Sequence, residues 1–197
     1  MSSQLNIAIF ASGGGSNARA LLRYFQGHPD IRVSLLVSNN PHSGIFEMGP
    51  DFGVPTVLLP RHQDGDEIVR TLHTHEVELV VLAGYLKLIP DAVVAAFPRR
   101  IINIHPSLLP RYGGKGMYGM RVHEAVILAH EITSGITIHY VNEVYDQGEM
   151  IFQAELPVAA GWTPADLQAA VQRLEHQYFP EVVEKICAKL LSEKKIG

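Results

Sequence analysis

The chain has 197 residues with 47% hydrophobic residues, 18% charged residues and a net charge of −4, a balance that excludes a disordered chain and a broad basic surface for nucleic acid. Its single cysteine excludes an internal disulfide and a cysteine-rich zinc site. Because no apolar run approaches the ~20 residues of a membrane helix and the first residues lack a secretory signal, we expect a cytoplasmic protein without membrane or nucleic-acid partners.

Short apolar runs alternate with helical segments in the first half of the chain. We expect strands at 5–11, 31–37, 55–59 and 78–83 and helices at 18–25, 44–52, 64–75 and 90–97. These strands are apolar almost throughout, which is typical of a parallel sheet covered by helices on both faces. The opening order of strand, glycine loop and helix is that of a doubly wound α/β fold.

The second half of the chain predicts a change of strand direction. A strand at 101–105 precedes a glycine-rich loop and a helix from about 120 to 130. Residues 136–141 and 150–158 then predict two strands that can pair as an antiparallel hairpin. We therefore expect a Rossmann-like fold with a mixed sheet of about seven strands, parallel at first and antiparallel at the end.

A long helix at 163–191 is expected to close the chain. Thr163 suits its N-cap and Pro164 its first turn, where the N–H that proline lacks would have no helical partner. Pro180 lies inside this helix, and we expect it to kink or interrupt the helix because proline removes one helical hydrogen bond.

The strand at 101–105 carries Asn103 and His105 two positions apart, so both side chains point to one face. Pro106 cannot donate to a sheet ladder, so the strand ends where this pair becomes accessible, and ligands of open α/β sheets bind at such ends. The pair suits acyl transfer, in which Asn103 holds an oxyanion and His105 moves a proton near neutral pH. The spacing also fits a plain polar strand end without a ligand.

The string Asn-Ile-His-Pro-Ser-Leu-Leu-Pro at 103–110, with Asp146 about forty residues later, resembles the signature of the folate-dependent formyltransferases. The resemblance implies an enzyme that moves the formyl group of 10-formyltetrahydrofolate to an amine, with Asn103, His105 and Asp146 as catalytic residues and without a metal. Separately, we expect Ser107 to support these three residues, and His139, which lies between apolar neighbours on a strand, to support them or to be purely structural. The string does not choose among family members, which act on glycinamide ribonucleotide, sugar nucleotides or methionyl-tRNA.

Gly13, Gly15 and Ala18 satisfy the G-x-G-x-x-A form of the nucleotide-binding fingerprint. An NAD site also needs an acid at the end of the second strand, where this chain has Ser38-Asn39-Asn40, so NAD is disfavoured. The helix that follows the glycines still predicts an anion site at its start.

By resemblance, this loop holds the 5′-phosphate of glycinamide ribonucleotide through Gly14, Gly15, Ser16 and Asn17. A plain N-cap without a ligand is the alternative interpretation of the same residues. On the helix at 163–191, Gln172 is expected to reach the phosphate and Glu175 to bind the glycinamide part of the substrate. These features favour glycinamide ribonucleotide as the amine substrate, and hence a role in purine biosynthesis.

The segment after the fourth strand resembles the part of the family that grips the folate ring. The residues expected to bind folate are Tyr85, Leu86, Lys87, Leu88, Ile89, Val141 and Asn142. Many family members carry Arg at the position of Lys87, so contact with the folate tail is left open, as is the role of the loop at 113–117.

We expect one domain over 1–197, with a phosphate-binding half at 5–90, a catalytic and folate-binding half at 91–160, and the helix at 163–191. The length argues against relatives that carry an additional RNA-binding or regulatory domain. A non-catalytic nucleotide-binding protein is the alternative from another functional class. The oligomeric state is left open, a homodimer included.

Overall fold

The structure is a computed structural model that describes residues 4–59 and 63–194. Within these residues, seven strands form one sheet in the order β3-β2-β1-β4-β5-β6-β7. The strands are β1 (Leu5–Phe10), β2 (Ile31–Ser38), β3 (Thr56–Leu58), β4 (Leu79–Leu82), β5 (Ile101–His105), β6 (Thr133–Tyr140) and β7 (Met150–Pro157). The helices are α1 (Ser16–Phe25), α2 (Ile45–Phe52), α3 (Gly65–Thr74), α4 (Asp91–Ala96), α5 (Met120–Leu128) and α6 (Pro164–Lys194). The predicted doubly wound fold is confirmed.

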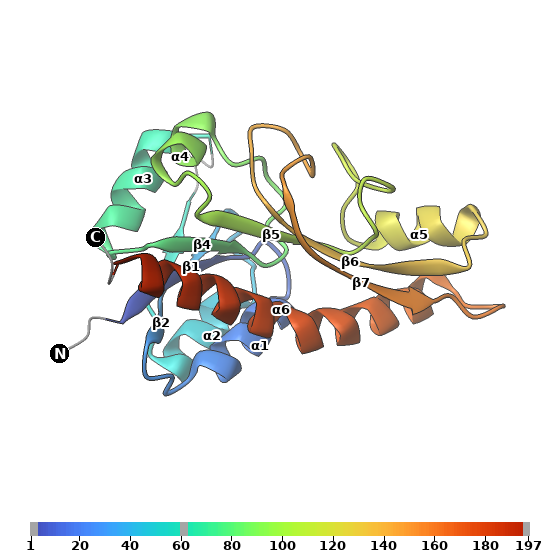
Figure 1. Cartoon of the computed structure of the whole chain (residues 1–197), viewed down its shortest axis with the longest axis horizontal. Coiled ribbons are helices and arrows are strands. Elements are labelled where there is room, and N and C mark those ends of the chain that lie inside the picture. The colour runs from blue at the N-terminus through green and yellow to red at the C-terminus, as the bar shows by residue number, and fades with distance from the viewer. Residues whose placement is uncertain (1–3, 60–62, 195–197) are drawn as a thin grey trace.

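Helices cover both faces of the sheet, which explains why its central strands are apolar on both sides (Figure 1). In β1, Ile7 and Ile9 belong to the core that α1, α2 and α6 cover. Ala8 and Phe10 belong to the opposite core, beneath α3 and α4. The central strands β1, β4 and β5 are thus buried between two helical layers.

The sheet changes from parallel to antiparallel between β5 and β6. β5 pairs in parallel with β4 and antiparallel with β6, which places Asn103 opposite His139 and His105 opposite Thr137. β6 and β7 form the predicted hairpin. Because β1, β4 and β5 run in the same direction, their carboxyl ends meet at one edge of the sheet, where such folds bind ligands.

The C-terminal helix α6 packs against α1, α5 and β6 and runs along the sheet (Figure 1). Its start is capped as predicted: Thr163 N–H donates to Asp166 Oδ2 at 2.8 Å, and Asp166 N–H donates to Thr163 Oγ1 at 3.2 Å. The interruption that was one expectation for Pro180 is absent, and α6 continues as one helix to Lys194. Buried neighbours on both sides, Phe179 and Val183 among them, hold the helix against the core at this point.

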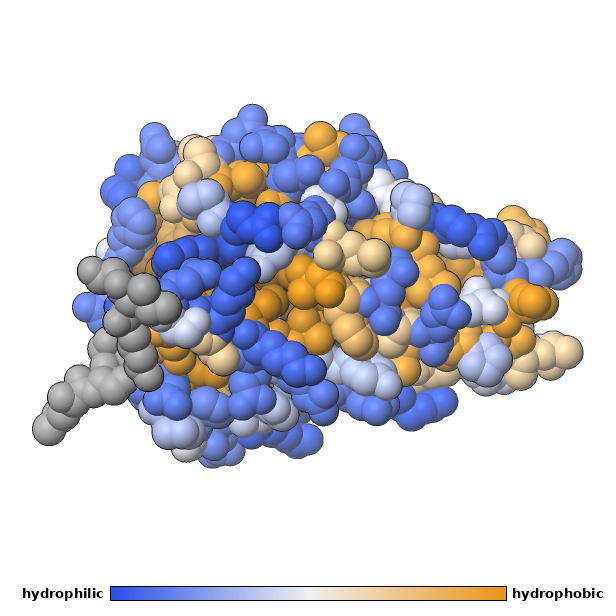
Figure 2. Space-filling view, in the orientation of Figure 1, coloured by the Kyte–Doolittle hydropathy of each residue, from blue (hydrophilic) through white to orange (hydrophobic). Residues whose placement is uncertain are grey.

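Hydrophilic residues cover much of the face shown in Figure 2. Apolar residues gather near its middle and at the end formed by the α5–β6 and β7–α6 connections. At that end Leu128 and Ile132 are each 81% exposed. Among the residues described, none of the helices has the length and apolar character needed to cross a membrane.

Candidate active site

A cavity of about 380 Å³ opens at the carboxyl ends of β1, β4 and β5. Its walls come from the loop before α1, the segment after β4, the loop before α5, the turn between β6 and β7, and the first half of α6. The predicted residues that line it are Gly14, Gly15, Ser16, Asn17, Tyr85, Leu86, Lys87, Leu88, Ile89, Asn103, His105, His139, Val141, Asn142, Asp146, Gln172 and Glu175. Of the predicted site residues, Ser107 alone does not line it.

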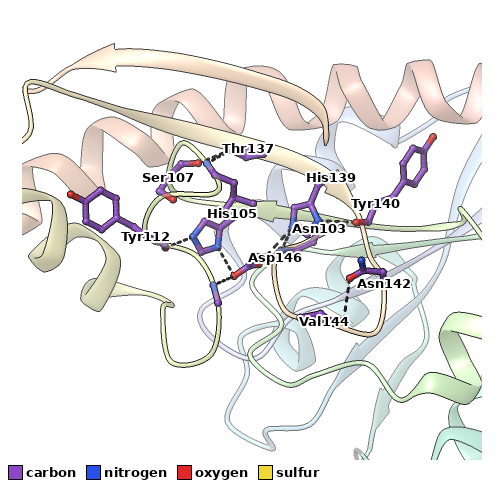
Figure 3. Close-up of polar contacts among 12 residues, drawn as sticks. Asn103, His105, Ser107, Tyr112, Thr137, His139, Tyr140, Asn142, Val144 and Asp146 are labelled. Atoms are coloured by element: carbon purple, nitrogen blue, oxygen red, sulfur yellow. Dashed lines mark hydrogen bonds and ion pairs between the residues drawn. The ribbon is translucent and has the colours of Figure 1, made fainter. Parts of the chain in front are cut away.

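Asn103, His105 and Asp146 all line this cavity, and their side chains converge (Figure 3). His105 Nδ1 lies 3.5 Å from Asp146 Oδ2, and His139 Nε2 lies 3.6 Å from Asp146 Oδ1. Two histidines on neighbouring strands therefore face the two oxygens of one carboxylate, which the turn between β6 and β7 carries. The register of β5 and β6 produces this arrangement, because it sets Asn103 beside His139.

Backbone geometry holds Asp146 in place. The residue has a φ of 55°, in the left-handed region that few non-glycine residues adopt. Its Oδ2 accepts a hydrogen bond from Gly114 N–H at 2.8 Å. The turn also requires Gly148, because a Cβ there would lie 1.6 Å from the carbonyl oxygen of Tyr140. Unfavourable backbone of this kind concentrates at functional sites, where the surrounding structure maintains it.

Burial and neighbouring charges have opposite effects on the pKa values of His105 and Asp146. Burial lowers the pKa of His105 below its ordinary value, although the Asp146 carboxylate and the Tyr112 carbonyl favour the charged ring. Burial alone would raise the pKa of Asp146, but contact with His139, the charge of His105 and the Gly114 N–H hold it below its ordinary value. At neutral pH the pair therefore consists of a neutral imidazole beside an ionised carboxylate.

His139 orients the side-chain amide of Asn103. His139 Nδ1 lies 2.8 Å from the carbonyl oxygen of Tyr140, an acceptor, so in the neutral form of the ring this nitrogen carries the hydrogen. His139 Nε2 is then an acceptor, and it receives a hydrogen bond from Asn103 Nδ2 at 3.1 Å. The amide has two N–H groups, and the second stays available to an oxygen in the cavity.

Ser107 shapes the loop after β5 instead of lining the cavity. It is 1% exposed, and its hydroxyl donates to the carbonyl oxygen of Arg111 at 2.7 Å. Its own carbonyl oxygen accepts a hydrogen bond from Thr137 Oγ1 at 2.7 Å. Ser107 therefore lies behind the site, where it ties the loop to β6.

The start of α1 faces the cavity without a side-chain cap. The N-cap residue is Gly15, with a φ of 74°, and no side chain caps the first turn. The alternative in which Ser16 or Asn17 caps the helix is therefore not what the structure shows. Uncapped N–H groups at a helix start attract anions, because they carry the positive end of the helix dipole.

Ser16 and Asn17, at the start of α1, both contact α6 through their side chains. Gln172 Nε2 donates to Ser16 Oγ at 2.7 Å, and Asn17 Nδ2 donates to Glu175 Oε2 at 2.8 Å. The predicted phosphate residues and the predicted glycinamide residues thus lie side by side, although they are far apart in the sequence. Asn17 Oδ1 is buried without a hydrogen-bond partner in the described part of the chain.

Glu175 makes the stability of the protein depend on pH. Burial raises its pKa from 4.5 to about 7, although the hydrogen bond from Asn17 opposes the shift. The folded protein then keeps this proton over a pH range in which the unfolded chain loses it, so the free energy of unfolding falls by about 3 kcal/mol as the pH rises from 4.5 to about 7.

This dependence is measurable by urea unfolding between about pH 4.5 and pH 8, with Glu175→Gln as the reference. The glutamine cannot ionise, so wild type should lose stability relative to the variant up to about pH 7 and run parallel to it above. A difference between the two proteins that stays constant over the whole range would contradict the raised pKa.

Ser12 connects the glycine loop to the predicted folate wall. Its hydroxyl accepts a hydrogen bond from Leu86 N–H at 3.0 Å and donates to Asn39 Oδ1 at 2.6 Å. Asn40 Nδ2 donates to the carbonyl oxygen of Ser12 at 2.8 Å. The two asparagines thus stand where a dinucleotide site would need an acid, and they bind the protein's own loop.

The predicted folate wall is mostly apolar. Leu86 and Leu88 are exposed and line the cavity, as does Lys87. Tyr85 packs edge-on against Phe10, and its buried hydroxyl has no hydrogen-bond partner among the described residues. An apolar wall with a few polar groups is typical of sites for flat aromatic ligands.

The sequence left the role of the loop before α5 open, and His123 was not predicted as a site residue. Gly114, Gly116 and Met117 of this loop line the cavity, so the segment whose role was open belongs to the site. His123 also lines the cavity and is 3% exposed, and burial together with the nearby His105 lowers its pKa to about 4. Nothing in the spacing of His123 distinguishes it from a surface histidine, because its burial depends on tertiary packing.

The described residues contain no group of three or more His, Cys, Asp and Glu side chains that could hold a metal ion. Among the charged and polar groups that line the cavity, Asn103, His105 and Asp146 form a cluster, and the cavity also contains the uncapped start of α1. This arrangement has the features of an acyl-transfer centre on a doubly wound α/β fold.

Comparison with known proteins agrees with this class. The formyl transferase family model matches residues 5–183, and the chain belongs to this family. It is 44% identical to a chloroplastic phosphoribosylglycinamide formyltransferase of Vigna unguiculata, over 97% of this chain and 64% of the relative. It is 35% identical to the phosphoribosylglycinamide formyltransferase of Bacillus subtilis, over 91% of this chain and 93% of the relative.

Solved structures give the same result. The phosphoribosylglycinamide formyltransferase of Anaplasma phagocytophilum superimposes with a TM-score of 0.87 at 32% identity, over 95% of this chain and 88% of that one. The family resemblance carried by residues 103–110 is therefore confirmed, and so is the predicted mixed sheet. The chain spans slightly under two thirds of the Vigna relative's length.

Proposed function

We propose that this protein transfers the formyl group of 10-formyltetrahydrofolate to the primary amine of glycinamide ribonucleotide, a step of purine biosynthesis. The observation that carries the proposal is the meeting of Asn103, His105 and Asp146 in one cavity with an uncapped helix start. The names of the Vigna and Bacillus relatives support the same substrate. The partners in this proposal are two small molecules, and the cosubstrate is the folate.

The reaction begins with the neutral imidazole of His105. The substrate amine attacks the formyl carbon, and His105 accepts the proton that the amine releases, at Nδ1 beside the Asp146 carboxylate. The imidazolium of His105 thus forms during the reaction. Asn103 donates its second N–H to the oxyanion, a contact that contributes ~3 kcal/mol in comparable sites. The intermediate then collapses, and the proton passes to the departing folate nitrogen.

Binding is divided among the cavity walls in this proposal. The start of α1, with Ser16 and Asn17, receives the substrate phosphate, and Glu175 lies beside the glycinamide part. The folate lies along the wall after β4, between 85–89 and 141–142. The cavity takes residues from each of the predicted segments 5–90, 91–160 and 163–191, and this division stays a prediction.

Transfer of a labelled formyl group tests the proposal. The protein is mixed with 10-formyltetrahydrofolate labelled in the formyl group and with glycinamide ribonucleotide, charged initiator tRNA or an amino-sugar nucleotide. Label on glycinamide ribonucleotide is the expected result. Label on another acceptor would make the protein a different formyltransferase. Ligand binding without transfer to any of them would favour a nucleotide-binding protein that is not an enzyme.

Ser16→Ala should weaken binding of the phosphorylated substrate. The hydroxyl borders the uncapped start of α1, and the loss of one hydrogen bond to a charged group should raise KM for glycinamide ribonucleotide by about tenfold. The kcat and the KM for the folate should stay near wild type. Steady-state kinetics beside Ser192→Ala, an exposed serine at the far end of α6, checks this, and an unaltered KM would remove the phosphate assignment.

A further inference from the structure

The ring of His105 is anchored by a backbone carbonyl. His105 Nε2 lies 2.8 Å from the carbonyl oxygen of Tyr112, which has no hydrogen to give, so Nε2 carries the hydrogen of the neutral ring (Figure 3). Nδ1 then holds the lone pair. It faces Asp146 Oδ2 at 3.5 Å, a distance too long for a strong hydrogen bond. The anchored nitrogen and the nitrogen that faces the carboxylate are therefore different atoms with different tasks.

Tyr112 holds this carbonyl in an unfavourable backbone conformation. Its φ is 57°, a left-handed value that an aromatic residue rarely adopts. Asp146, on the other side of the His105 ring, also has a positive φ of 55°. Both groups that contact the ring nitrogens thus come from backbone that needs support from its surroundings.

The support for Tyr112 comes from Glu131, at the start of the segment before β6. The Tyr112 hydroxyl donates to Glu131 Oε1 at 2.7 Å, and the same carboxylate forms an ion pair with Arg111. The Arg111 guanidinium carbon also lies 5.5 Å from the centre of the Tyr112 ring. Glu131 is 17% exposed, so the contact is sheltered from solvent. We refer to Arg111, Tyr112 and Glu131 as the Tyr112 clasp.

We propose that the Tyr112 clasp is a positioning device for catalysis: Tyr112 and Glu131 fix the hydrogen of His105 on Nε2 and reserve Nδ1 for the proton of the reacting amine. The inference deepens the proposed function and rests on it for the role of Nδ1. With the proton on the wrong nitrogen, the lone pair would point at the Tyr112 carbonyl, and Nδ1 would have no capacity to accept from the amine.

Other charged groups near the ring do not replace this contact. Asp146 and the Tyr112 carbonyl favour the charged form of His105, whereas burial and His139 disfavour it. His123 also lies close enough for its charge and that of His105 to repel. None of these groups except the Tyr112 carbonyl binds Nε2. Without the clasp, the hydrogen of the neutral ring should therefore be shared between Nε2 and Nδ1. The pKa of His105 should also fall, because the Tyr112 carbonyl, which raises it, is displaced.

Two substitutions break the clasp at different points. Tyr112→Phe removes the hydroxyl and keeps the ring, and Glu131→Ala removes its acceptor. Each should lower kcat by about tenfold with little change in KM for either substrate, because the clasp does not line the binding walls. The double variant should be no slower than the slower single variant, since both changes break one contact. Glu78→Gln is the control, because Glu78 is 18% exposed and pairs with Lys194 away from the cavity.

The nitrogen spectrum of His105 separates positioning from a merely structural role. In protein labelled with ¹⁵N at histidine, His105→Gln identifies the His105 signals by their loss. Above its pKa, wild type and Glu78→Gln should show a protonated Nε2 and an unprotonated Nδ1. In Tyr112→Phe and Glu131→Ala, the chemical shifts of Nδ1 and Nε2 should lie closer to each other than in wild type. The fall in kcat/KM on the acid side should occur at lower pH than in wild type.

Either readout can overturn the inference. Unchanged nitrogen shifts in both variants would do so even if kcat fell, because the loss would then come from elsewhere. Changed shifts with kcat within twofold of Glu78→Gln would also do so, because the position of the hydrogen would then not matter. If wild type transfers no formyl group, the proposed function fails by itself, and the nitrogen shifts alone decide whether the clasp sets the hydrogen.

Discussion

Replacement of His105 by Gln should lower kcat for formyl transfer by about 1,000-fold, since general base catalysis of this kind contributes ~10²–10⁴-fold. The glutamine amide fills much of the same space and can still donate to the Tyr112 carbonyl, which His105 Nε2 contacts at 2.8 Å. It cannot accept a proton near neutral pH. The attacking amine would then have to release its proton to water, away from the Asp146 carboxylate.

Both ligands should still bind to this variant, because the phosphate loop and the wall after β4 do not depend on His105. Equilibrium binding of each substrate, measured beside kcat, checks this separation. His73→Gln is the control, since His73 is an exposed residue of α3 that does not line the cavity. Near-normal turnover of His105→Gln would remove the proposed proton transfer.

The helices and strands, and the pairing of Asn103 with His105, follow from local patterns in the sequence. Continuous apolar runs predict buried parallel strands, and the structure buries β1 on both faces, with Ile9 in one core and Phe10 in the other. Two-residue alternation places Asn103 and His105 on one face of β5, and both line the cavity. Such predictions succeed because they depend on neighbours along the chain.

The partners of these residues could not be predicted in the same way. The turn between β6 and β7 holds three acids, and only the family resemblance selected Asp146. In the structure Glu143 is exposed and Glu149 pairs with Arg99, whereas Asp146 faces His105. Which of the three acids faces His105 depends on the direction of a turn that is packed against a distant loop. The composition of the turn does not determine that direction.

The contact of Tyr112 with His105 is still less visible in a sequence. A backbone carbonyl belongs to every residue, so no residue type marks the one that binds His105 Nε2. The same holds for Ser12, whose hydroxyl joins Leu86 to Asn39 across three loops. Contacts of this kind are set by tertiary packing, and they decide how the residues of the cavity are oriented.

Asp146→Asn should lower kcat by about 1,000-fold through the loss of charge, because a similar change beside a catalytic histidine has an effect of ~10⁴-fold. The asparagine can keep the hydrogen bond from Gly114 N–H, which Asp146 Oδ2 accepts at 2.8 Å, and it tolerates the φ of 55° well. The turn should therefore keep its shape. What is lost is the negative charge that stabilises the imidazolium formed on His105.

The pH profile distinguishes this role of Asp146 from that of a base. Wild type should lose kcat/KM as the pH falls through the pKa of His105, because the ring must start neutral. The Asp146 carboxylate raises the pKa of His105. In Asp146→Asn the fall in kcat/KM should therefore occur at lower pH than in wild type. Glu143→Gln, an exposed change in the same turn, should keep the wild-type profile. Disappearance of the acid limb in Asp146→Asn would instead make Asp146 the group that must lose its proton.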